Sequence, residues 1–451
     1  MNTWQDLVTA SLLGTERTAV PPTRIPGLPT LADVAEDPAA ILLDRAALLT
    51  AARRAGRPPE HAELLPAAEP DPARVVSPAA ARRLARMLSG EYPDLLTEWL
   101  TAAVTRGLKA PAQLLPALLD RARRVSPTDP ELRRLVAEAG GSRARWLAGL
   151  NPGWEFVTAD TATGDDAWRL GDASQRRGYL AALRARDPDA ARELIAGSWD
   201  VAGAERVMFL SVLADESAAS KGSKGSTGSK GLSLADEPLL EAALGDRVEE
   251  VRGWAAYLLA SLPGSALGQR MAERARRCLR LDQGIRGTRL LASPPAECDA
   301  AMRRDGITPG PGPGRSQLAH RTRLMLEVLA RTPLGTWTEE FRMTPAQITA
   351  VPSGDWAQVL FAGWSRAAIV QHDQDWMAAL ITEALTGRSP ETPAETAALR
   401  QLARRADPGL GASGVLPDLE PNAPTVLCDA AGVLRFRHDM LKELDDDHRA
   451  G

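Results

Sequence analysis

Apolar positions along this chain recur with the period of an α-helix. The clearest case is residues 234–264, where one short helix is predicted from about Glu237 to Leu244 and stops at Gly245. In the helix that follows, apolar residues recur every three or four positions and so share one face; they are Val248, Val251, Ala255, Leu258, Leu259 and Leu262. A helical hairpin with one apolar face on each helix must stack on neighbours to bury it.

The same period predicts helices over most of the chain. Several begin with a capping residue followed by proline, as at Ser77-Pro78 and Asp187-Pro188, a pairing typical of helix N-termini. The predicted helices cover residues 1–20, 38–55, 77–89, 91–106, 111–124, 131–139, 175–186, 187–199, 205–214, 317–331, 344–351, 354–369, 373–386 and 392–406. Residues 426–446 fit either a small hairpin or a helix.

These patterns predict an all-α protein: a HEAT-like α-solenoid with irregular helical ends. We divide the chain into an N-terminal helical region, 1–150, HEAT-like helical repeats, 151–304, and a C-terminal helical region, 317–451. The repeats contain the Gly-, Ser- and Lys-rich stretch 217–231, which we expect to be a flexible insertion because it offers almost nothing apolar to bury. Residues 305–316, rich in Gly and Pro, are predicted to be a linker.

Composition agrees with this picture and narrows the class of protein. The 451 residues are 44% hydrophobic, enough for a sizeable core, and the formal net charge is only −4. Three cysteines, an odd number, argue against a disulfide scaffold. There is no signal-peptide pattern and no apolar stretch near the ~18 residues that span a bilayer. We therefore expect a cytoplasmic protein with reduced Cys278, Cys298 and Cys428.

Motifs that carry chemistry are missing. The sequence has no HExxH, CxxC, GxSxG or SxxK, and we expect no metal, no cofactor and no catalytic residue. The run 310–316 resembles a phosphate-binding loop only superficially, because Pro311 and Pro313 lack the backbone N–H groups that such a loop needs. In the acidic run 372–375, Asp373 or Asp375 is well placed to cap the helix that follows. Asp445–Asp447 with His448 is expected to be a solvated tail.

Arginine is concentrated between residues 270 and 323, which hold 12 Arg against 5 acidic residues. A basic solenoid surface could bind a phosphate backbone. The candidate anion surface comprises Arg270, Arg274, Arg277, Arg280 and Arg286. However, the stretch contains no aromatic residue that could stack on bases, and arginine is the common polar residue throughout this chain. Cys278 lies among these arginines, but it also falls on the apolar face of its helix.

Tryptophan is the other notable residue type, with 11 copies. Trp356 and Trp364 are eight positions apart and so share nearly one helical face, with Trp376 further along. Tryptophan side chains are most often buried in the core. The alternative is an exposed partner surface formed by these three residues, because tryptophan is enriched in binding hot spots.

Two resemblances add to these patterns. The spacing of Asp246, Val251-Arg252 and Ala255-Ala256 resembles a HEAT-type repeat, and the resemblance implies that Asp246 and Arg252 belong to a structural ladder. More of the chain resembles an uncharacterised bacterial family, a domain of unknown function. That second resemblance is carried by TASLLGTER (9–17), LLTEWL (95–100), RWLAGLNPGW (145–154), LADEPLLEAALGDR (234–247) and GDWAQVLFAGWSRAAI (354–369).

The family resemblance also implies a setting, because its members are encoded near MoxR-type AAA ATPases, von Willebrand A-type proteins and SWIM zinc-finger proteins. We therefore expect a non-catalytic protein-binding scaffold or adaptor in a MoxR-type AAA ATPase/von Willebrand A-type system. Its expected partners are an AAA ATPase or a von Willebrand A-type protein. We expect no association with a membrane. Two alternatives stay open: a nucleic-acid-binding α-solenoid that uses the Arg-rich surface, and an enzyme whose site is assembled from distant residues.

Overall fold

The computed structural model describes most of the chain. The described residues are 3–23, 36–55, 65–124, 130–158, 165–214, 231–285, 287–308, 317–387, 390–412, 414, 416–417, 419 and 423–449. Residues 217–230 of the predicted insertion, 309–316 of the predicted linker, and Arg286 lie outside them.

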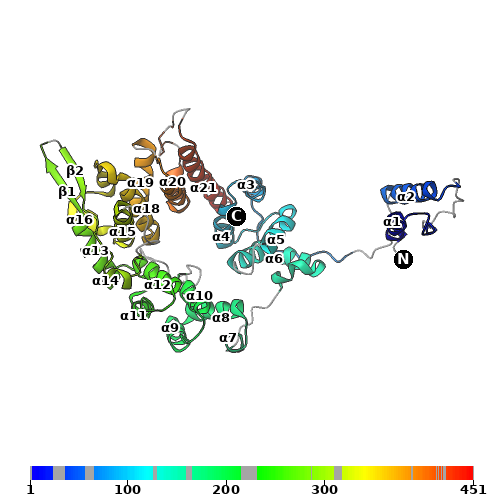
Figure 1. The fold of residues 1–451 in the computed structure, drawn as a ribbon, viewed down its shortest axis with the longest axis horizontal. Coiled ribbons are helices and arrows are strands. Elements are labelled where there is room, and N and C mark those ends of the chain that lie inside the picture. Colours follow the sequence, from blue (N-terminus) through cyan, green and yellow to red (C-terminus); the bar gives the residue numbers. More distant parts are fainter. Residues whose placement is uncertain are drawn as a thin grey trace. The chain divides into compact units, whose positions relative to one another are not determined.

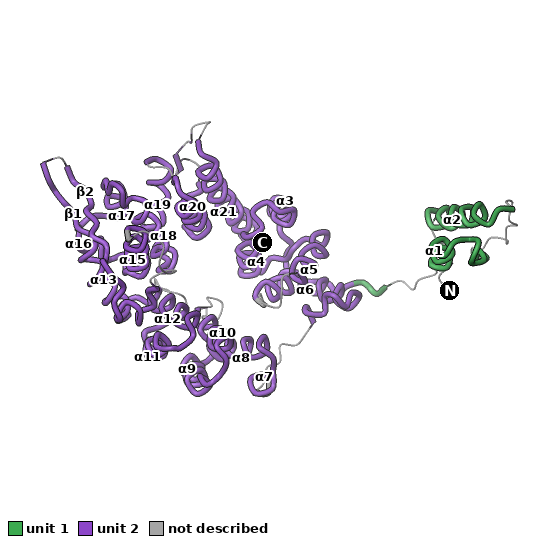
Figure 2. Tube along the Cα trace, in the orientation of Figure 1, with its two compact units in different colours: residues 1–67 green, residues 68–451 purple. Residues whose placement is uncertain are grey.

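The chain divides into two compact units, Met1–Ala67 and Ala68–Gly451 (Figure 2). Unit 1 contains α1 (Thr3–Leu13) and α2 (Pro38–Ala55), which contact each other. Arg45 of α2 donates hydrogen bonds to the carbonyl oxygens of Val20 and Pro21, at 2.8 and 2.7 Å. These bonds hold the segment after α1 against α2.

The first part of unit 2 is a helical bundle around the buried Trp99. Its elements are α3 (Pro78–Leu88), η1 (Pro93–Leu95), α4 (Leu96–Thr105), η2 (Ala112–Leu114), α5 (Leu115–Arg124), α6 (Pro130–Leu150) and η3 (Pro152–Val157). Ser77 caps α3 as predicted, its hydroxyl accepting from the Ala80 N–H. Gly141 kinks α6 at φ 58°, a conformation that favours glycine, and a Cβ there would overlap the Asp71 carboxylate.

The central part of unit 2 consists of helices that pack on their neighbours in sequence. Thus α8 contacts α9 and α10, α10 contacts α12, and α12 contacts α11 and α13. The elements are α7 (Asp165–Arg169), α8 (Ala173–Arg186), α9 (Pro188–Gly197), α10 (Gly203–Leu213), η5 (Leu234–Asp236), α11 (Glu237–Ala243), α12 (Glu249–Ser261), α13 (Ala266–Cys278) and α14 (Ala300–Arg304). The predicted helical hairpin at 234–264 corresponds to α11 and α12. The HEAT-like solenoid itself stays a prediction.

A β-hairpin follows α13, so the protein is mostly helical rather than purely so. Strands β1 (Leu279–Gly284) and β2 (Gly287–Ala292) pair antiparallel, with Leu279 opposite Ala292 and Gly284 opposite Gly287. The helical period did not predict this hairpin. Its signal in the sequence is weak. Residues 279–282 alternate apolar and polar side chains but 287–292 do not, and the Ile and Arg between Gly284 and Gly287 are not residues that two-residue hairpin turns favour.

The C-terminal part returns to helices. They are α15 (Gln317–Arg331), α16 (Gly335–Phe341), α17 (Pro345–Thr349), η6 (Gly354–Trp356), α18 (Ala357–Gln371), α19 (Gln374–Thr386), α20 (Pro393–Arg405), η7 (Pro408–Gly411) and α21 (Thr425–Arg449). Among these, α18 contacts α15, α19, α20 and, from the central part, α12. The two readings left open for 426–446 are thereby resolved in favour of a helix.

The last helix, α21, joins two hydrophobic cores that are far apart in sequence. Leu427, Ala430 and Leu434 belong to the core of the central and C-terminal helices. Phe436 and Met440, one to two turns later, belong to the core of the N-terminal bundle. Figure 1 accordingly places α21 between α20 and the pair α3 and α4. The end of the chain therefore closes unit 2 onto its beginning.

None of the helices described is long and apolar enough to cross a membrane.

Candidate functional site

The arginine-rich helix α13 is the centre of the candidate site. Ser265 caps it, the Ser265 hydroxyl accepting from the Gly268 N–H at 3.1 Å. The apolar period buries Met271, Ala275 and Cys278 against the core. The same period leaves the arginines between these positions on the other side of the helix, where they can reach neighbouring elements.

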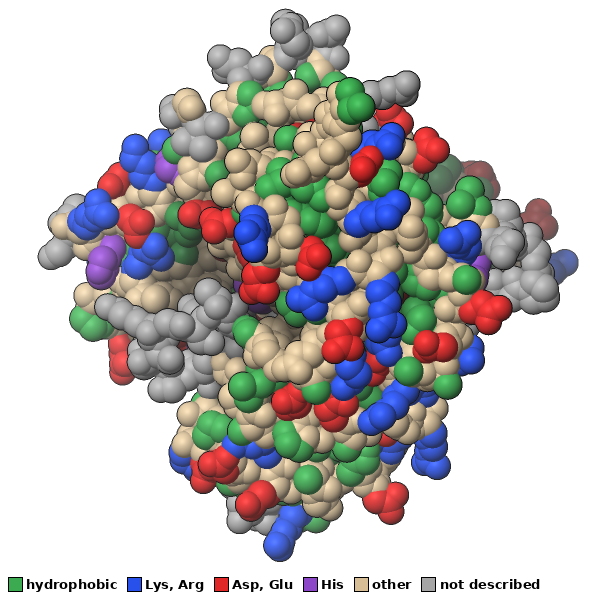
Figure 3. Space-filling model, turned by 90° about the vertical axis from the view of Figure 1, so that its left-hand side faces the viewer, with side chains coloured by type: hydrophobic (Ala, Val, Ile, Leu, Met, Phe, Trp, Pro, Cys, Tyr) green, Lys and Arg blue, Asp and Glu red, His purple; other side chains and the backbone are tan. Residues whose placement is uncertain are grey.

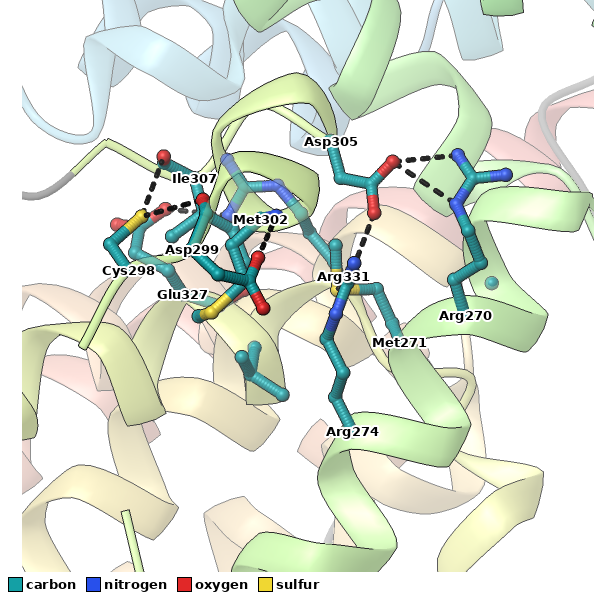
Figure 4. Close-up of polar contacts among 12 residues, drawn as sticks. Arg270, Met271, Arg274, Cys298, Asp299, Met302, Asp305, Ile307, Glu327 and Arg331 are labelled. Atoms are coloured by element: carbon teal, nitrogen blue, oxygen red, sulfur yellow. Dashed lines mark hydrogen bonds and ion pairs between the residues drawn. The ribbon is translucent and has the colours of Figure 1, made fainter. Parts of the chain in front are cut away.

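Two of these arginines bind one buried carboxylate (Figure 4). Asp305, at the end of α14, is only 2% exposed. It accepts from Arg270 Nη2 at 2.8 Å and from Arg274 Nη1 at 2.5 Å. Arg270 also donates to Glu241 of α11 at 3.0 Å. Burial opposes the charge of Arg270, but the bonds to Asp305 and Glu241 outweigh it and raise the pKa of this guanidinium.

The backbone that follows Asp305 is held from α15. Arg331 donates to the carbonyl oxygen of Gly306 at 3.2 Å and to the carboxylate of Glu327 at 2.5 Å. The thiol of Cys298 lies 3.6 Å from the carbonyl oxygen of Ile307. Helices α13 and α15 and the thiol of Cys298 therefore hold residues 305–307. We call this network the clamp, and it links α11, α13, α14 and α15.

The clamp engages two members of the predicted anion surface, and the ability of that surface to bind an anion stays a prediction. Arg270 and Arg274 both pair with Asp305, and their side chains are 33% and 18% exposed. Arg277 and Arg280 are exposed and form no ion pair with any residue that the structure describes. Arg286 lies outside the described residues. Figure 3 views the molecule from the side of β1 and β2, where basic and acidic side chains are interspersed rather than gathered into one basic patch.

The β-hairpin projects from the same region. Leu279 and Leu290 are buried at its base, and the Leu290 N–H donates to the carbonyl oxygen of Pro352 at 2.9 Å. Asp282 and Arg289 face each other in register and form an ion pair at 2.8 Å. At the turn, the side chain of Ile285 is fully exposed. The hairpin therefore has an anchored base and a solvent-exposed apolar tip.

The predicted ladder residues Asp246 and Arg252 contact each other, but through the backbone. Arg252 donates to the carbonyl oxygen of Asp246 at 2.8 Å. The Asp246 carboxylate instead accepts from the Val248 N–H at 2.8 Å and lies 3.0 Å from Arg206 of α10. It also accepts from the indole N–H of Trp199 at 3.2 Å. Asp246 therefore ties the start of α12 to the preceding helices.

The predicted tryptophan surface is wrong for two of its three members. Trp364 and Trp376 are 3% and 1% exposed, and their rings lie 5.3 Å apart in the core. Trp356 is half-buried and packs against the same core. Trp364 and Trp376 lie on the inward faces of α18 and α19, together with the other buried residues of these helices.

Other candidate groups serve structure. The Asp373 carboxylate caps α19, accepting from the Trp376 N–H at 3.1 Å, as the sequence predicted. Burial raises the pKa of Asp373 and raises that of the Cys278 thiol to about 11. No three histidine, cysteine or acidic side chains in the described ranges are placed to hold a metal ion.

The acidic C-terminus is not the solvated tail that we predicted. Asp445 accepts from Arg106 Nε at 2.7 Å. The Asp447 carboxylate is buried and accepts from the Ser77 N–H at 2.8 Å, just before α3. His448 Nδ1 lies 3.1 Å from the carbonyl oxygen of Arg106. These residues anchor the end of α21 to the N-terminal bundle, a role that their sequence distance from it concealed.

Comparison with known proteins adds one match. A family model described as "Family of unknown function (DUF5691)" matches residues 6–410. The comparisons find no similar curated protein and no similar solved structure.

Proposed function

Because the chain belongs to the family of unknown function DUF5691, we propose its function from its physical chemistry: a non-catalytic protein-binding scaffold or adaptor. The finer part of the proposal is its setting, a MoxR-type AAA ATPase/von Willebrand A-type system. That setting rests on the family resemblance of the sequence motifs. The partner is then the AAA ATPase or the von Willebrand A-type protein of that system.

The observation that carries the proposal is the β-hairpin 279–292. Its base is fixed by the buried Leu279 and Leu290, so its shape exists before any partner arrives. Its tip carries Ile285 in full contact with water. A preformed element binds with a smaller entropic cost than a flexible one, and a projecting apolar side chain supplies a buried anchor to a partner.

The commitment of Arg270 and Arg274 to Asp305 favours protein over nucleic acid as the partner. Affinity for a phosphate backbone depends on basic side chains free to replace counterions. Here the buried carboxylate of Asp305 pairs with two of the five candidate arginines. Arg277 and Arg280 keep the nucleic-acid alternative testable, since both are exposed.

The test is a pull-down of the tagged full chain from native lysate, with and without nuclease, read by mass spectrometry and by absorbance at the nucleic-acid maximum. We expect a stoichiometric ATPase or von Willebrand A-type partner that survives nuclease. Ile285→Asp should lose it. Leu170→Asp, a change at an exposed leucine outside the hairpin, should retain it. Nucleic acid as the only bound material, or a partner indifferent to Ile285→Asp, would contradict the proposal.

A further inference from the structure

A pocket of about 270 Å³ lies where α12, α15, α18 and α20 meet. Its polar lining comprises Tyr257, Glu327, Arg331, Arg366 and Gln401, and Ile369 is among its apolar residues. The pocket adjoins the clamp described above, because Glu327 and Arg331 belong to both. None of its lining residues belongs to the β-hairpin that carries the proposed scaffold function.

The charges around this pocket do not cancel. Glu327 is largely buried and is neutralised by Arg331 at 2.5 Å, while Arg331 also donates to the Gly306 carbonyl oxygen. Arg366 lies 3.6 Å from the second oxygen of Glu327, too far for a hydrogen bond. Among the described lining residues, two guanidinium groups therefore face one carboxylate. One positive charge remains, and it belongs to Arg366.

The donors of Arg366 are available to a ligand. Its side chain is 54% exposed, and it makes no hydrogen bond to the part of the chain that the structure describes. Tyr257 adds a hydroxyl and Gln401 an amide, neither of which bonds to another described residue. Tyr257 stands edge-on to Trp254, with ring centroids 5.8 Å apart, which restricts the position of the hydroxyl.

We propose that this pocket binds the carboxylate of a small organic acid or of an acidic side chain, with Arg366 as its ion-pair partner. A planar guanidinium matches a carboxylate with two parallel hydrogen bonds. The volume is below that of most pockets for drug-sized ligands, which suits a body of a few carbon atoms against Ile369. A phosphate dianion fits less well, because the one uncompensated positive charge, that of Arg366, balances only one of its two negative charges.

Binding is tested with the purified full chain by ligand-observed NMR titration. The probes are propionate, a capped peptide with one glutamate, propionamide and inorganic phosphate. We expect roughly millimolar binding of propionate or of the peptide. Propionamide, which has the same shape without the charge, should bind at least about tenfold more weakly. Binding of propionate indicates a free acid as the source, whereas binding of the peptide alone indicates a partner protein.

The matched variants are Arg366→Gln and Arg400→Gln. Arg400 is also half exposed, at 51%, and also lies 3.6 Å from a carboxylate, that of Asp429. Arg366→Gln should weaken binding by about tenfold or more, and Arg400→Gln should leave it unchanged. Circular dichroism checks that both variants fold. Absence of binding by either acid, phosphate binding as tight as theirs, or equal binding by Arg366→Gln would overturn the proposal. These outcomes are independent of the pull-down result for Ile285→Asp, so the failure of one proposal can be distinguished from the failure of the other.

Discussion

Arg437 of α21 binds both carboxylate oxygens of Glu98 in α4, at 2.8 to 3.2 Å, across 339 residues of sequence. Its remaining donors reach the carbonyl oxygens of Ala403 and Ala406, at 3.0 and 2.6 Å, at the end of α20. One guanidinium thus joins the N-terminal bundle, α20 and α21. Because Arg437 is buried, its charge depends on these acceptors for compensation.

Removing this guanidinium should destabilise the protein. Arg437→Met leaves Glu98 and two carbonyl oxygens without their donor, and we expect a loss of about 3 kcal/mol in the free energy of unfolding. Urea unfolding followed by circular dichroism measures it. Arg435→Met is the control, because Arg435 is exposed on the same helix and should matter little. Equal unfolding midpoints for the two variants would show that α21 is not held by this contact.

A second prediction concerns the buried pair formed by Arg184 and Asp236. Asp236 is fully buried and accepts two bonds of 2.7 Å from Arg184 and a third of 3.2 Å from Arg192. Asp236→Asn leaves the buried Arg184 undercompensated, whereas Arg192 keeps its ion pair with Asp189. We expect a loss of about 3 to 5 kcal/mol in the free energy of unfolding. Asp355→Asn, at an exposed position, serves as the control. Thermal unfolding of both variants at neutral pH makes the comparison.

The same aspartate should make stability sensitive to acid. Burial alone favours the protonated form, but the bonds from Arg184 outweigh burial and hold the pKa of Asp236 below its usual 3.8. The stabilisation is therefore complete above about pH 4, and it is lost as the pH falls through the lower pKa of the folded state. Unfolding midpoints measured from pH 7 to pH 3 should fall more steeply for the parent protein than for Asp236→Asn. Parallel curves would argue that another carboxylate governs the acid limb.

The three cysteines should differ in reactivity. Burial raises the pKa of Cys278 to about 11 and also raises that of Cys298, so both remain protonated and shielded near pH 8. Cys428 is exposed. Alkylation of the folded protein should label Cys428 alone, and denaturation should release all three sites to the reagent. Peptide mapping by mass spectrometry identifies them, and rapid native labelling of Cys278 would contradict its buried position.

Shortening the segment 217–230 should leave stability nearly unchanged. Arg184 of α8 and Asp236, on the two sides of this segment, bind each other directly, so this contact does not depend on the segment's length. Loop-closure entropy varies slowly with length, and halving the segment should change the free energy of unfolding by less than about 1 kcal/mol. Chemical denaturation checks this. A large loss would mean that the segment itself packs on the fold.

Local physics made much of this structure predictable from sequence alone. Helix positions follow from the apolar period, and the capping roles of Ser77 and Asp373 follow from side chains that act within three residues of themselves. The hairpin at 279–292 was not predicted, because its second strand does not alternate apolar and polar residues and its turn lacks the residues that hairpin turns favour.

Tertiary packing decided the partners of the charged residues. The sequence predicts a basic surface that includes Arg270 and Arg274. In the structure both bind Asp305, which is more than thirty residues away in the chain. Trp364 and Trp376 could line a partner surface or a core, since the helical period identifies a face without saying what covers it.

The acidic end of α21 was predicted to be a solvated tail because the sequence does not show which distant element it meets. Its carboxylates meet Arg106 and the Ser77 N–H only because the last helix returns to the first bundle. A local pattern specifies which way a side chain points along its own element; what it meets depends on contacts between elements far apart in the chain.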